Sequence, residues 1–388
     1  MAEFESRQAF EHIDKLAYEI GPRLAGTRGD AMAAEYISKQ LKGYGLKVTA
    51  QEFSFVDRYG RAKVTACLFA VALVLALFLS PIISIIIWLV AQALWCSLSR
   101  VMPRRTSRNL IAIKEAEVPK RKIAVTAHYD SARVTVSSRF SLAVGFAFLP
   151  ALVLVTVVLT INVFVAVPAW PIFWFVLAAI LLPLCGAMFF GANSRRVSPG
   201  AEDNASGTAV MLEAARVLAE LPPPETSLTF VAFGAEEQGL VGSRELAKSK
   251  LLPPDTQMLN LDMVGASSIP YVIEGNGMVR KVRTPASINQ KLIASVVNIG
   301  LKPKMWWAPL AGHDHIPLVK AGIKATTFTF DTSGTDDLGK HLSRWFNLPN
   351  ARMRGYRQLH SVDDTPERIS LANIERAGAV VLDFVKAI

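Results

Sequence analysis

The sequence predicts an α/β fold in which a mostly parallel, mixed sheet is covered by helices on both faces, with transmembrane helices inserted into it. Two observations lead to this prediction. In the polar part of the chain, continuous apolar runs alternate with amphipathic segments, which is typical of buried parallel strands connected by helices. The other apolar residues gather in two uncharged blocks, in a chain of 388 residues that is 51% hydrophobic with a mean hydropathy of +0.32.

The first part of the chain predicts two helices followed by three strands. Residues 5–22 and 29–44 have the spacing of amphipathic helices. Residues 46–56 alternate between apolar and polar side chains, as a half-buried strand does, and 109–115 are expected to form another strand. The run KIAVTAHYD at 122–130 is apolar almost throughout, so we expect it to be a strand covered on both faces.

The later part of the chain alternates between helices and strands. A helix is expected at 206–221, because its amphipathic pattern begins on Ser-Gly and stops before three prolines. Buried strands are expected at 227–234 and 257–265. The remaining elements are a helix at 285–301, a strand at 324–330 and a closing helix at 371–388. This alternation predicts a parallel sheet with helices on both sides.

The two apolar blocks, 64–98 and 140–191, contain no Asp, Glu, Lys or Arg. A membrane helix needs about 20 apolar residues, so the second block is long enough for two helices with a break near 166–171. The first block is barely long enough for two helices with a turn at Ser80 and Pro81. It could instead form one long tilted helix or a re-entrant hairpin. Each block leaves the polar domain and returns to it, which favours four crossings. Buried helices of a soluble core are the alternative, but uncharged runs of this length are rare there.

The blocks divide the chain into a discontinuous polar domain and two insertions. We expect the polar domain to consist of residues 1–63, 99–139 and 192–388, with membrane insertions at 64–98 and 140–191. All three cysteines lie in the insertions, so neither a disulfide framework nor a thiolate metal site can be inferred.

The net charge of +10 is concentrated at the flanks of the apolar blocks. Basic residues lie on each flank that faces the polar domain: Arg61, Lys63, Arg100, Arg104, Arg105, Arg108, Arg139, Arg195 and Arg196. This is the positive-inside pattern, so we expect an integral, multi-pass membrane protein in contact with the lipid bilayer, with the polar domain on the cytoplasmic face. Nucleic-acid binding is not expected, because the polar segments show no basic face with interleaved aromatic residues.

Side chains suited to metal binding and acid–base chemistry occur where the predicted strands end. In an open α/β sheet, ligands collect beyond the carboxyl ends of the strands. The strand ends carry His128, Asp130, Glu236, Glu237 and Asp262, and nearby loops carry Asp203 and His360. Taken singly, such residues have ordinary explanations: a helix cap, a turn former or a surface histidine. Together they are imidazoles and carboxylates without a lysine, which is the composition of a metal site with nitrogen and oxygen ligands.

The spacing within two short motifs indicates roles for their side chains. His128 and Asp130 are two residues apart at a strand end and face the same way, so Asp130 can accept the second ring N–H of His128 and orient that ring. Glu236 and Glu237 are adjacent and point apart. Their repulsion disappears if a divalent cation neutralises Glu237 while Glu236 serves as a general base.

Six motifs occur in a fixed order between about residue 10 and the C-terminus: AHYDS, EDNASGTA, GAEEQGLVGS, LNLDMVG, GHDHIPLVKAGI and LHSVDDTPE. In order and content they resemble the co-catalytic di-zinc exopeptidases, a family that includes aminopeptidase Y, aminopeptidase S and, more remotely, glutamate carboxypeptidase II. The resemblance implies a zinc-exopeptidase fold of the phosphorylase/hydrolase-like type and two Zn²⁺ ions per chain. It further implies that His128 and Asp262 bind one zinc, that Glu237 and His360 bind the other, and that Asp203 bridges both.

The resemblance also implies an activity. A membrane-bound exopeptidase would hydrolyse a peptide substrate with metal-activated water, using Glu236 as the base and Asp130 as the partner of His128. An aminopeptidase is favoured, because a free α-amine suits a site rich in carboxylates. Two alternatives stay open: a glutaminyl-cyclase-like acyltransferase with a single zinc, and a catalytically silent membrane scaffold. The intact DNASG and EEQG motifs speak against the first, and the complete set of ligand types speaks against the second.

The chain departs from the family pattern in one place. In typical relatives the HYD and DNASG motifs are close in sequence, whereas here the block 140–191 separates them. The GHDH motif offers His313 and His315, which are expected to be structural or to form a wall of the cleft and not to bind metal.

Overall fold

The computed structural model describes residues 3–134, 138–165, 170–192, 194–331, 344–346 and 358–387. The chain divides into two compact units, both discontinuous in sequence. The sheet unit consists of residues 1–54, 106–133 and 197–388, and the helical unit consists of residues 55–105 and 134–196.

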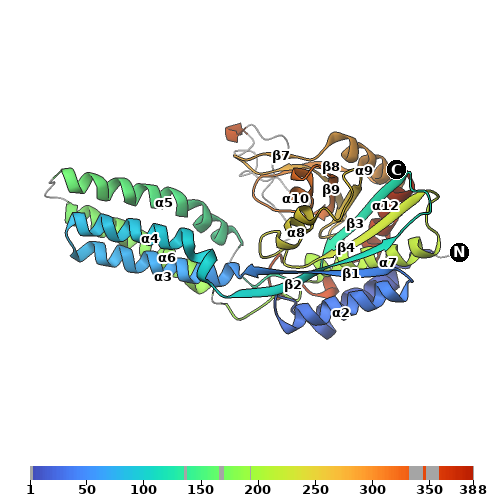
Figure 1. The fold of residues 1–388 in the computed structure, drawn as a ribbon, viewed down its shortest axis with the longest axis horizontal. Coiled ribbons are helices and arrows are strands. Elements are labelled where there is room, and N and C mark those ends of the chain that lie inside the picture. Colours follow the sequence, from blue (N-terminus) through green and yellow to red (C-terminus); the bar gives the residue numbers. More distant parts are fainter. Residues whose placement is uncertain are drawn as a thin grey trace. The chain divides into compact units, whose positions relative to one another are not determined.

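The sheet has nine strands within the described residues, in the order β1-β2-β4-β3-β5-β9-β6-β7, with β8 paired to β6 (Figure 1). The strands are β1 Lys47–Val56, β2 Arg104–Lys114, β3 Arg121–His128, β4 Thr226–Phe233, β5 Gln257–Leu261, β6 Ile269–Asn276, β7 Val282–Arg283, β8 Lys304–Ala308 and β9 Lys324–Asp331. The central strands β4, β3, β5 and β9 run parallel, whereas β2 and β6 join them antiparallel. The predicted mixed, mostly parallel sheet is therefore confirmed.

Helices cover both faces of the sheet, as predicted. Side chains along β3 alternate between two apolar layers, with Ile123 and Val125 in one and Ala124 in the other. Helices of the first layer are α1 Ser6–Asp14, α2 Arg28–Gly43, α7 Gly207–Glu220, α9 Ala286–Asn298 and α12 Leu371–Ala387. Helices of the second layer are α8 Val241–Ser249 and α10 His315–Lys320.

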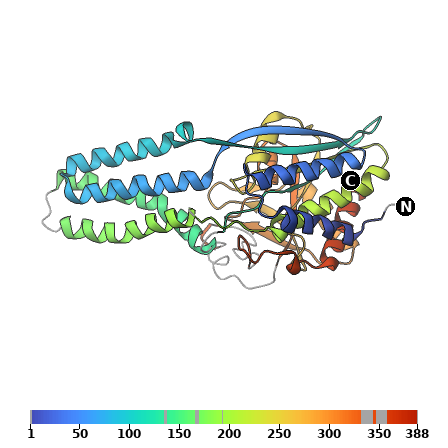
Figure 2. The ribbon, with the colours of Figure 1, turned by 90° about the horizontal axis from the view of Figure 1, so that it is seen from below.

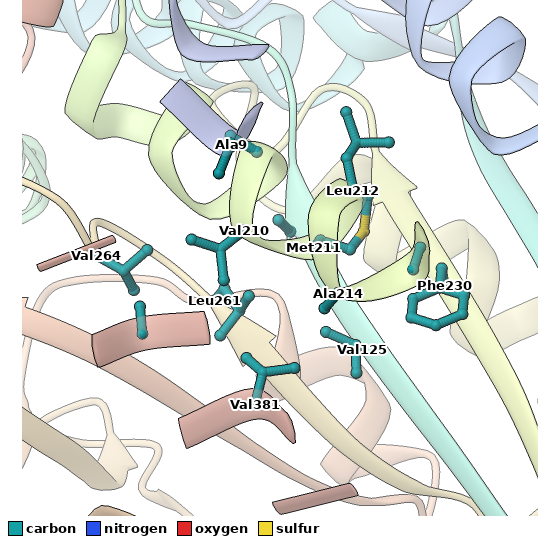
Figure 3. Packing of buried hydrophobic residues seen from close by; sticks show 14 of the residues in the cluster. Ala9, Val125, Val210, Met211, Leu212, Ala214, Phe230, Leu261, Val264 and Val381 are labelled. Carbon is teal, nitrogen blue, oxygen red and sulfur yellow. The ribbon is translucent and has the colours of Figure 1, made fainter. Parts of the chain in front are cut away.

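Helix α7 lies at the centre of the first layer (Figure 3). Its residues Val210, Met211 and Ala214 lie against Val125 of β3 and Leu261 of β5. Burying an apolar side chain such as valine or methionine stabilises a fold by about 1.5–3 kcal/mol. This packing fixes the first turn of α7 against the strand ends.

The loop before α7 approaches the end of β5 closely. A Cβ atom on Gly207 would lie 2.4 Å from Asn204 Oδ1 and 2.8 Å from the carbonyl oxygen of Leu261, so only glycine fits there. Asn204 itself donates to the same Leu261 carbonyl at 2.8 Å and accepts from the Met263 N–H at 3.2 Å. The close approach brings the DNASG loop beside the residues that follow β5.

The strands β6, β7 and β8 and the helices α8 and α10 were not expected from the sequence. Strand β6 contains Pro270 and Gly275, and β7 has only two residues, so neither shows a sustained strand pattern. Helix α10 has six residues and contains Pro317, which leaves no helical period to detect. Strand β2 begins at Arg104, earlier than expected, because it lies beside β1 in the sheet while its basic side chains interrupt the apolar pattern.

The helical unit contains α3 Arg58–Phe78, α4 Pro81–Val101, α5 Ser138–Phe164 and α6 Trp170–Ala192. Helix α3 packs on α4 and α6, and α5 packs on the same two helices (Figures 1 and 2). The first apolar block therefore forms two helices, one of the options left open by the sequence. The segments 58–78, 81–98 and 171–192 are long and apolar enough to cross a membrane, and α5 has 27 residues.

A small polar cluster joins α4 to α5 inside the helical unit. Trp88 Nε1 and Gln92 Nε2 both donate to Thr156 Oγ1, at 2.9 and 3.0 Å. Thr156 in turn donates to the main-chain carbonyl of Leu152 at 2.7 Å. The cluster satisfies these polar atoms with neutral side chains only.

Candidate metal centre

The residues singled out at the strand ends converge at one edge of the sheet. His128 is the last residue of β3, Asp262 directly follows β5, and Glu237 lies in the turn after β4. These three strands are parallel neighbours in the sheet, so their carboxyl ends meet at the same edge. The loop before α7 adds Asp203, and the loop before α12 adds His360.

The five residues form two triads that share one carboxylate. In the first, His128 Nε2 lies 3.2 Å from Asp203 Oδ1 and 3.8 Å from Asp262 Oδ1. In the second, His360 Nε2 lies 3.3 Å from Asp203 Oδ2 and 3.0 Å from Glu237 Oε1. Asp203 thus directs one oxygen to each triad. Within each triad the three donor atoms lie within 4.8 Å of one another.

This donor set fits divalent cations of the zinc type. Zinc takes imidazole nitrogen and carboxylate oxygen at about 2.0–2.2 Å, and catalytic zinc sites commonly have three protein ligands and one open position. Each triad offers one imidazole and two carboxylates, at separations that such a cation can span. Asp203, Glu237 and Asp262 are at most 6% exposed, so the negative charge is held away from water.

The histidines of the triads have strongly shifted pKa values. Burial opposes a charge on His128, but the carboxylates of Asp130, Asp203 and Asp262 outweigh it and hold the pKa of His128 well above its usual range. For His360, burial is likewise outweighed by Glu237 and Asp203, and its pKa also lies well above the usual range. Without a cation, the acids therefore draw protons onto both rings. A divalent ion would supply this positive charge instead and leave the rings free to bind it.

The two adjacent glutamates have different surroundings. Glu237 is buried and belongs to the second triad, whereas Glu236 is only partly buried. Removal of the Glu236 carboxyl from water raises its pKa well above the usual range; the positive charge of His128 opposes this, and the negative charges of Glu237, Asp314 and Asp262 add to it. A carboxyl that holds a proton more tightly than usual is suited to acid–base work.

Asp130 lies against His128, as expected, and also binds the turn that carries the two glutamates. Its carboxylate accepts the main-chain N–H groups of Glu236 at 3.0 Å and Glu237 at 3.1 Å. His128 Nδ1 lies 3.2 Å from the main-chain carbonyl oxygen of Asp130 and 3.6 Å from its nearest carboxylate oxygen. Both the carbonyl group and the carboxylate of Asp130 therefore face this ring nitrogen, and the carboxylate also fixes the turn that carries the two glutamates.

His313, which the sequence assigned to a structural or cleft-wall role, contacts the centre. Its Nδ1 lies 2.9 Å from Asp262 Oδ2, the oxygen that faces away from His128. Its ring is buried and stacks on His315, with centroids 6.1 Å apart. Neither histidine belongs to a triad among the described residues. The GHDH motif lies on a loop and the first turn of a short helix, where no periodic pattern signals a contact with the strand ends.

Known proteins share this sequence region and fold. The family model described as Peptidase family M28 matches residues 189–385, half of the chain. Aminopeptidase YwaD of Bacillus subtilis is 32% identical over 192 residues, which cover 47% of this chain and 36% of that protein. A probable zinc metalloprotease of Pyrenophora tritici-repentis is 36% identical over 129 residues, covering 30% of this chain and 29% of that protein. The chain thus spans about a third of the length of these relatives.

Solved structures match nearly the whole chain at low sequence identity. A leucine aminopeptidase precursor from Bacteroides thetaiotaomicron superposes with a TM-score of 0.60 at 16% identity, covering 99% of this chain and 97% of that one. A zinc aminopeptidase from Bacillus subtilis gives 0.58 at 20% identity, covering 99% and 95%. A glutaminyl cyclase from Bacteroides thetaiotaomicron gives 0.61 at 16% identity, covering 99% and 98%. These likenesses establish the fold.

Proposed function

We propose, from the premise that this chain belongs to peptidase family M28, that it is a membrane-bound, zinc-dependent aminopeptidase that removes residues from the N-termini of peptides. The observation that carries the proposal is the pair of buried triads that share Asp203. Two donor sets joined by one carboxylate are the arrangement that holds two cations side by side.

The proposed roles follow from the contacts. His128 and Asp262 would hold one zinc, Glu237 and His360 the other, and Asp203 both. When bound, two zinc ions supply activation of water and polarisation of a carbonyl oxygen.

Glu236, the neighbour in sequence of Glu237 in the second triad, would act as the general base and general acid. Glu236 would take the proton of the attacking water and deliver it to the amine that leaves. Its raised pKa makes its carboxylate a stronger proton acceptor than that of an ordinary glutamate. Asp130 would hold the main chain of Glu236 in place for these steps.

The direction of trimming is supported by the relatives and by the side chains around the centre. Aminopeptidases are among the proteins that this chain resembles in sequence and in fold. The carboxylates of Asp203, Glu236, Glu237 and Asp262 supply oxygens that can accept hydrogen bonds from a substrate α-amine. These two observations support an aminopeptidase over a carboxypeptidase.

A glutaminyl-cyclase-like acyltransferase is the second candidate, favoured by the fold shared with a glutaminyl cyclase. It would use a single zinc. The presence of two complete triads argues against it, because a one-metal enzyme needs only one of them. A catalytically silent scaffold would have no need for either triad.

The deciding experiment uses the purified full-length protein in detergent with added zinc. Peptide libraries with free or blocked ends are incubated with it, and mass spectrometry identifies the end that is trimmed. We expect loss of N-terminal residues, complete inhibition by a chelator, and two zinc ions per chain. Cyclisation of N-terminal glutamine with one bound zinc would establish the second candidate instead. The absence of any reaction would favour the catalytically silent scaffold.

Glu236→Gln tests the base. The variant should lower kcat by about 10²- to 10⁴-fold and keep both metals. Glu35→Gln, at an exposed position of α2, is the matched control and should behave as wild type. Full activity of Glu236→Gln would remove Glu236 from the mechanism.

We also propose that the helical unit crosses the membrane four times, with the sheet unit on the cytoplasmic face. The helical unit carries one acid, Asp57, and nine basic residues. The basic residues all flank the helices at the ends joined to the sheet unit: Arg58, Arg61, Lys63, Arg100, Arg104, Arg105, Arg139, Arg195 and Arg196. The opposite ends carry no charge, which supports the proposed orientation and contact with anionic headgroups.

Cysteine labelling in intact cells tests the orientation. A membrane-impermeant maleimide should modify Ser80→Cys, in the turn between α3 and α4, from outside. It should modify Glu35→Cys on α2 only after the cells are opened. The reverse labelling pattern would invert the topology.

A further inference from the structure

Three buried acids lie next to the triads without belonging to them. Asp130 comes two residues after His128, Glu202 comes one residue before Asp203, and Asp364 comes four residues after His360. All three are 0% exposed. Asp130 holds the main chain of Glu236, whereas Glu202 and Asp364 have no part in the proposed chemistry.

Glu202 and Asp364 each accept two successive main-chain N–H groups. Glu202 Oε2 accepts from Gly265 at 2.8 Å and from Ala266 at 2.9 Å. Asp364 Oδ1 accepts from Glu202 at 2.8 Å, and its Oδ2 accepts from Asp203 at 3.2 Å. Asp130 does the same with Glu236 and Glu237.

In each case the acid that neighbours one metal ligand binds the loop of another. Asp130 ties the His128 strand end to the loop of Glu237. Glu202 ties the Asp203 loop to the loop that follows Asp262, and Asp364 ties the His360 loop to Asp203 itself. The connections therefore run between loops that are far apart in sequence and that meet only at this edge of the sheet.

We propose that Glu202 and Asp364 are positioning residues that assemble the two metal sites before any metal binds. This inference rests on the proposed two-metal function. Glu202 serves the site of His128, Asp203 and Asp262, and Asp364 serves the site of Asp203, Glu237 and His360. Hydrogen bonds from main-chain N–H groups to buried carboxyl oxygens are directional, so they hold the loops at ligand distance without using ligand atoms.

The two acids differ in a way that gives a sharp test. In Glu202 one oxygen accepts both N–H groups, so Glu202→Gln keeps both hydrogen bonds through its amide oxygen. In Asp364 each oxygen accepts one N–H, so Asp364→Asn places an NH₂ group against a main-chain N–H. The structure thus assigns a tolerated amide to position 202 and a disruptive amide to position 364, while Glu202→Ala removes both contacts there.

The experiment titrates zinc into the metal-free, full-length protein in detergent by calorimetry. Wild type should bind two ions. Asp364→Asn should lower the affinity of one site by about 10- to 100-fold, the usual effect of losing a group that orients a metal ligand. Glu202→Ala should weaken the other site by a similar factor, and Glu202→Gln should restore it.

Ligand variants identify the affected site. In a His360→Ala background only the first site remains, so Glu202→Ala should still weaken it and Asp364→Asn should have a smaller effect. In an Asp262→Asn background only the second site remains, so Asp364→Asn should weaken it and Glu202→Ala should have a smaller effect. Glu213→Gln is the matched control, because Glu213 is also buried and accepts a main-chain N–H, that of Glu5 at 2.9 Å, but contacts no ligand loop.

Hydrogen exchange of the metal-free protein checks that the sites are preformed. The amides of Glu202, Asp203, Gly265 and Ala266 should exchange slowly in wild type and faster in Glu202→Ala and Asp364→Asn. If these variants bind both ions as wild type does, or lose both equally with Glu213→Gln, the inference is overturned. If wild type itself fails to bind two ions, the proposed function fails and this inference with it.

Discussion

The edge of the sheet that carries the triads and the interior of the helical unit both remove polar side chains from water, and they use different groups to do so. At the sheet edge, the buried groups are carboxylates, imidazoles and the guanidinium of Arg23, and those of the triads and of Arg23 have hydrogen-bond or ion-pair partners on other segments. In the helical unit the polar cluster consists of an indole, an amide and a hydroxyl on Trp88, Gln92 and Thr156.

The difference teaches where buried charge can be tolerated. An isolated buried charge is destabilising by several kcal/mol unless it is paired and hydrogen-bonded. Loops at a strand edge supply many main-chain N–H and carbonyl groups, so charges there find partners. In a helix the main-chain groups already hydrogen-bond to one another, and the hydrocarbon in which we propose that the helical unit lies supplies no hydrogen-bond partners. Only neutral side chains that pair with each other are therefore suited to this unit.

The largest effect should come from Asp203→Asn. This change gives one triad an NH₂ group, which cannot bind a cation, and leaves the other triad a neutral amide oxygen in place of a charged one, so both triads are weakened. We expect bound zinc to fall from two ions per chain to less than one and peptide hydrolysis to fall to background, measured by elemental analysis and the peptide assay. Asp255→Asn, at an exposed ion pair with Lys122, is the control. Two tightly bound ions in the variant would contradict the shared role of Asp203.

Arg23→Met should have the next largest effect. The buried guanidinium donates at 2.7–2.8 Å to the main-chain carbonyls of Leu16, Tyr129, Pro199 and Gly200. Each buried carbonyl left without a donor costs about 1–3 kcal/mol, so we expect a loss of at least about 4 kcal/mol in the free energy of unfolding, measured by circular dichroism in detergent. Arg28→Met, at an exposed site, should change little. A stable Arg23→Met variant would show that this edge does not depend on its buried charge.

Asp30→Asn should alter the pH dependence of stability. Burial raises the pKa of Asp30 to about 7 from a usual value of 3.8. Between these values the folded protein retains a proton that the unfolded chain has lost, so this group lowers the free energy of unfolding as pH rises from about 4 to 7, by on the order of 3 kcal/mol in total.

The Asp30→Asn variant has no proton to lose at this position, so its stability curve should be flatter over that pH range. Thermal unfolding of both proteins at a series of pH values measures the difference. Parallel curves would mean that Asp30 is already ionised in the folded protein at pH 4.

Thr156→Val should have the smallest effect and tests the helical unit. It removes the acceptor of Trp88 and Gln92 and keeps the side-chain shape. Hydrogen bonds between membrane helices contribute about 0.6–2 kcal/mol, so a loss of about 1 kcal/mol is expected in detergent unfolding. Thr160→Val is the matched control, because its exposed hydroxyl only donates within its own helix. If Thr156→Val lowered the free energy of unfolding as much as Arg23→Met does, the two regions would not differ in the way described.

Part of the centre could be predicted because its signals are local. His128 and Asp262 follow apolar runs that form strands, and the pair at Glu236 and Glu237 follows another. The kinds of side chain at strand ends therefore indicated a metal site before any contact was known. The bridging role of Asp203 was different: it was implied by a family resemblance and not by spacing.

Other contacts had no local signal. The spacing of His128 and Asp130 predicted the approach of the carboxylate to the ring, which lies 3.6 Å from it. It did not predict that the Asp130 carbonyl oxygen lies closer to the ring, at 3.2 Å, or that the carboxylate also binds the next loop. Glu202 and Asp364 stand in motifs of polar residues where any of several acids could have been the buried one. Strand β6 and helix α10 are too short and too interrupted by proline to show a period.

The sequence by itself determined which chemical groups are available and which segments become strands, helices and apolar blocks, because these follow from side-chain type and from periods of two to four residues. The tertiary structure alone decided which oxygen of Asp203 faces which histidine and which loop each buried acid holds. Those contacts join residues separated by up to about 160 positions, and they depend on the order of strands in the sheet and on how closely the loops approach at its edge.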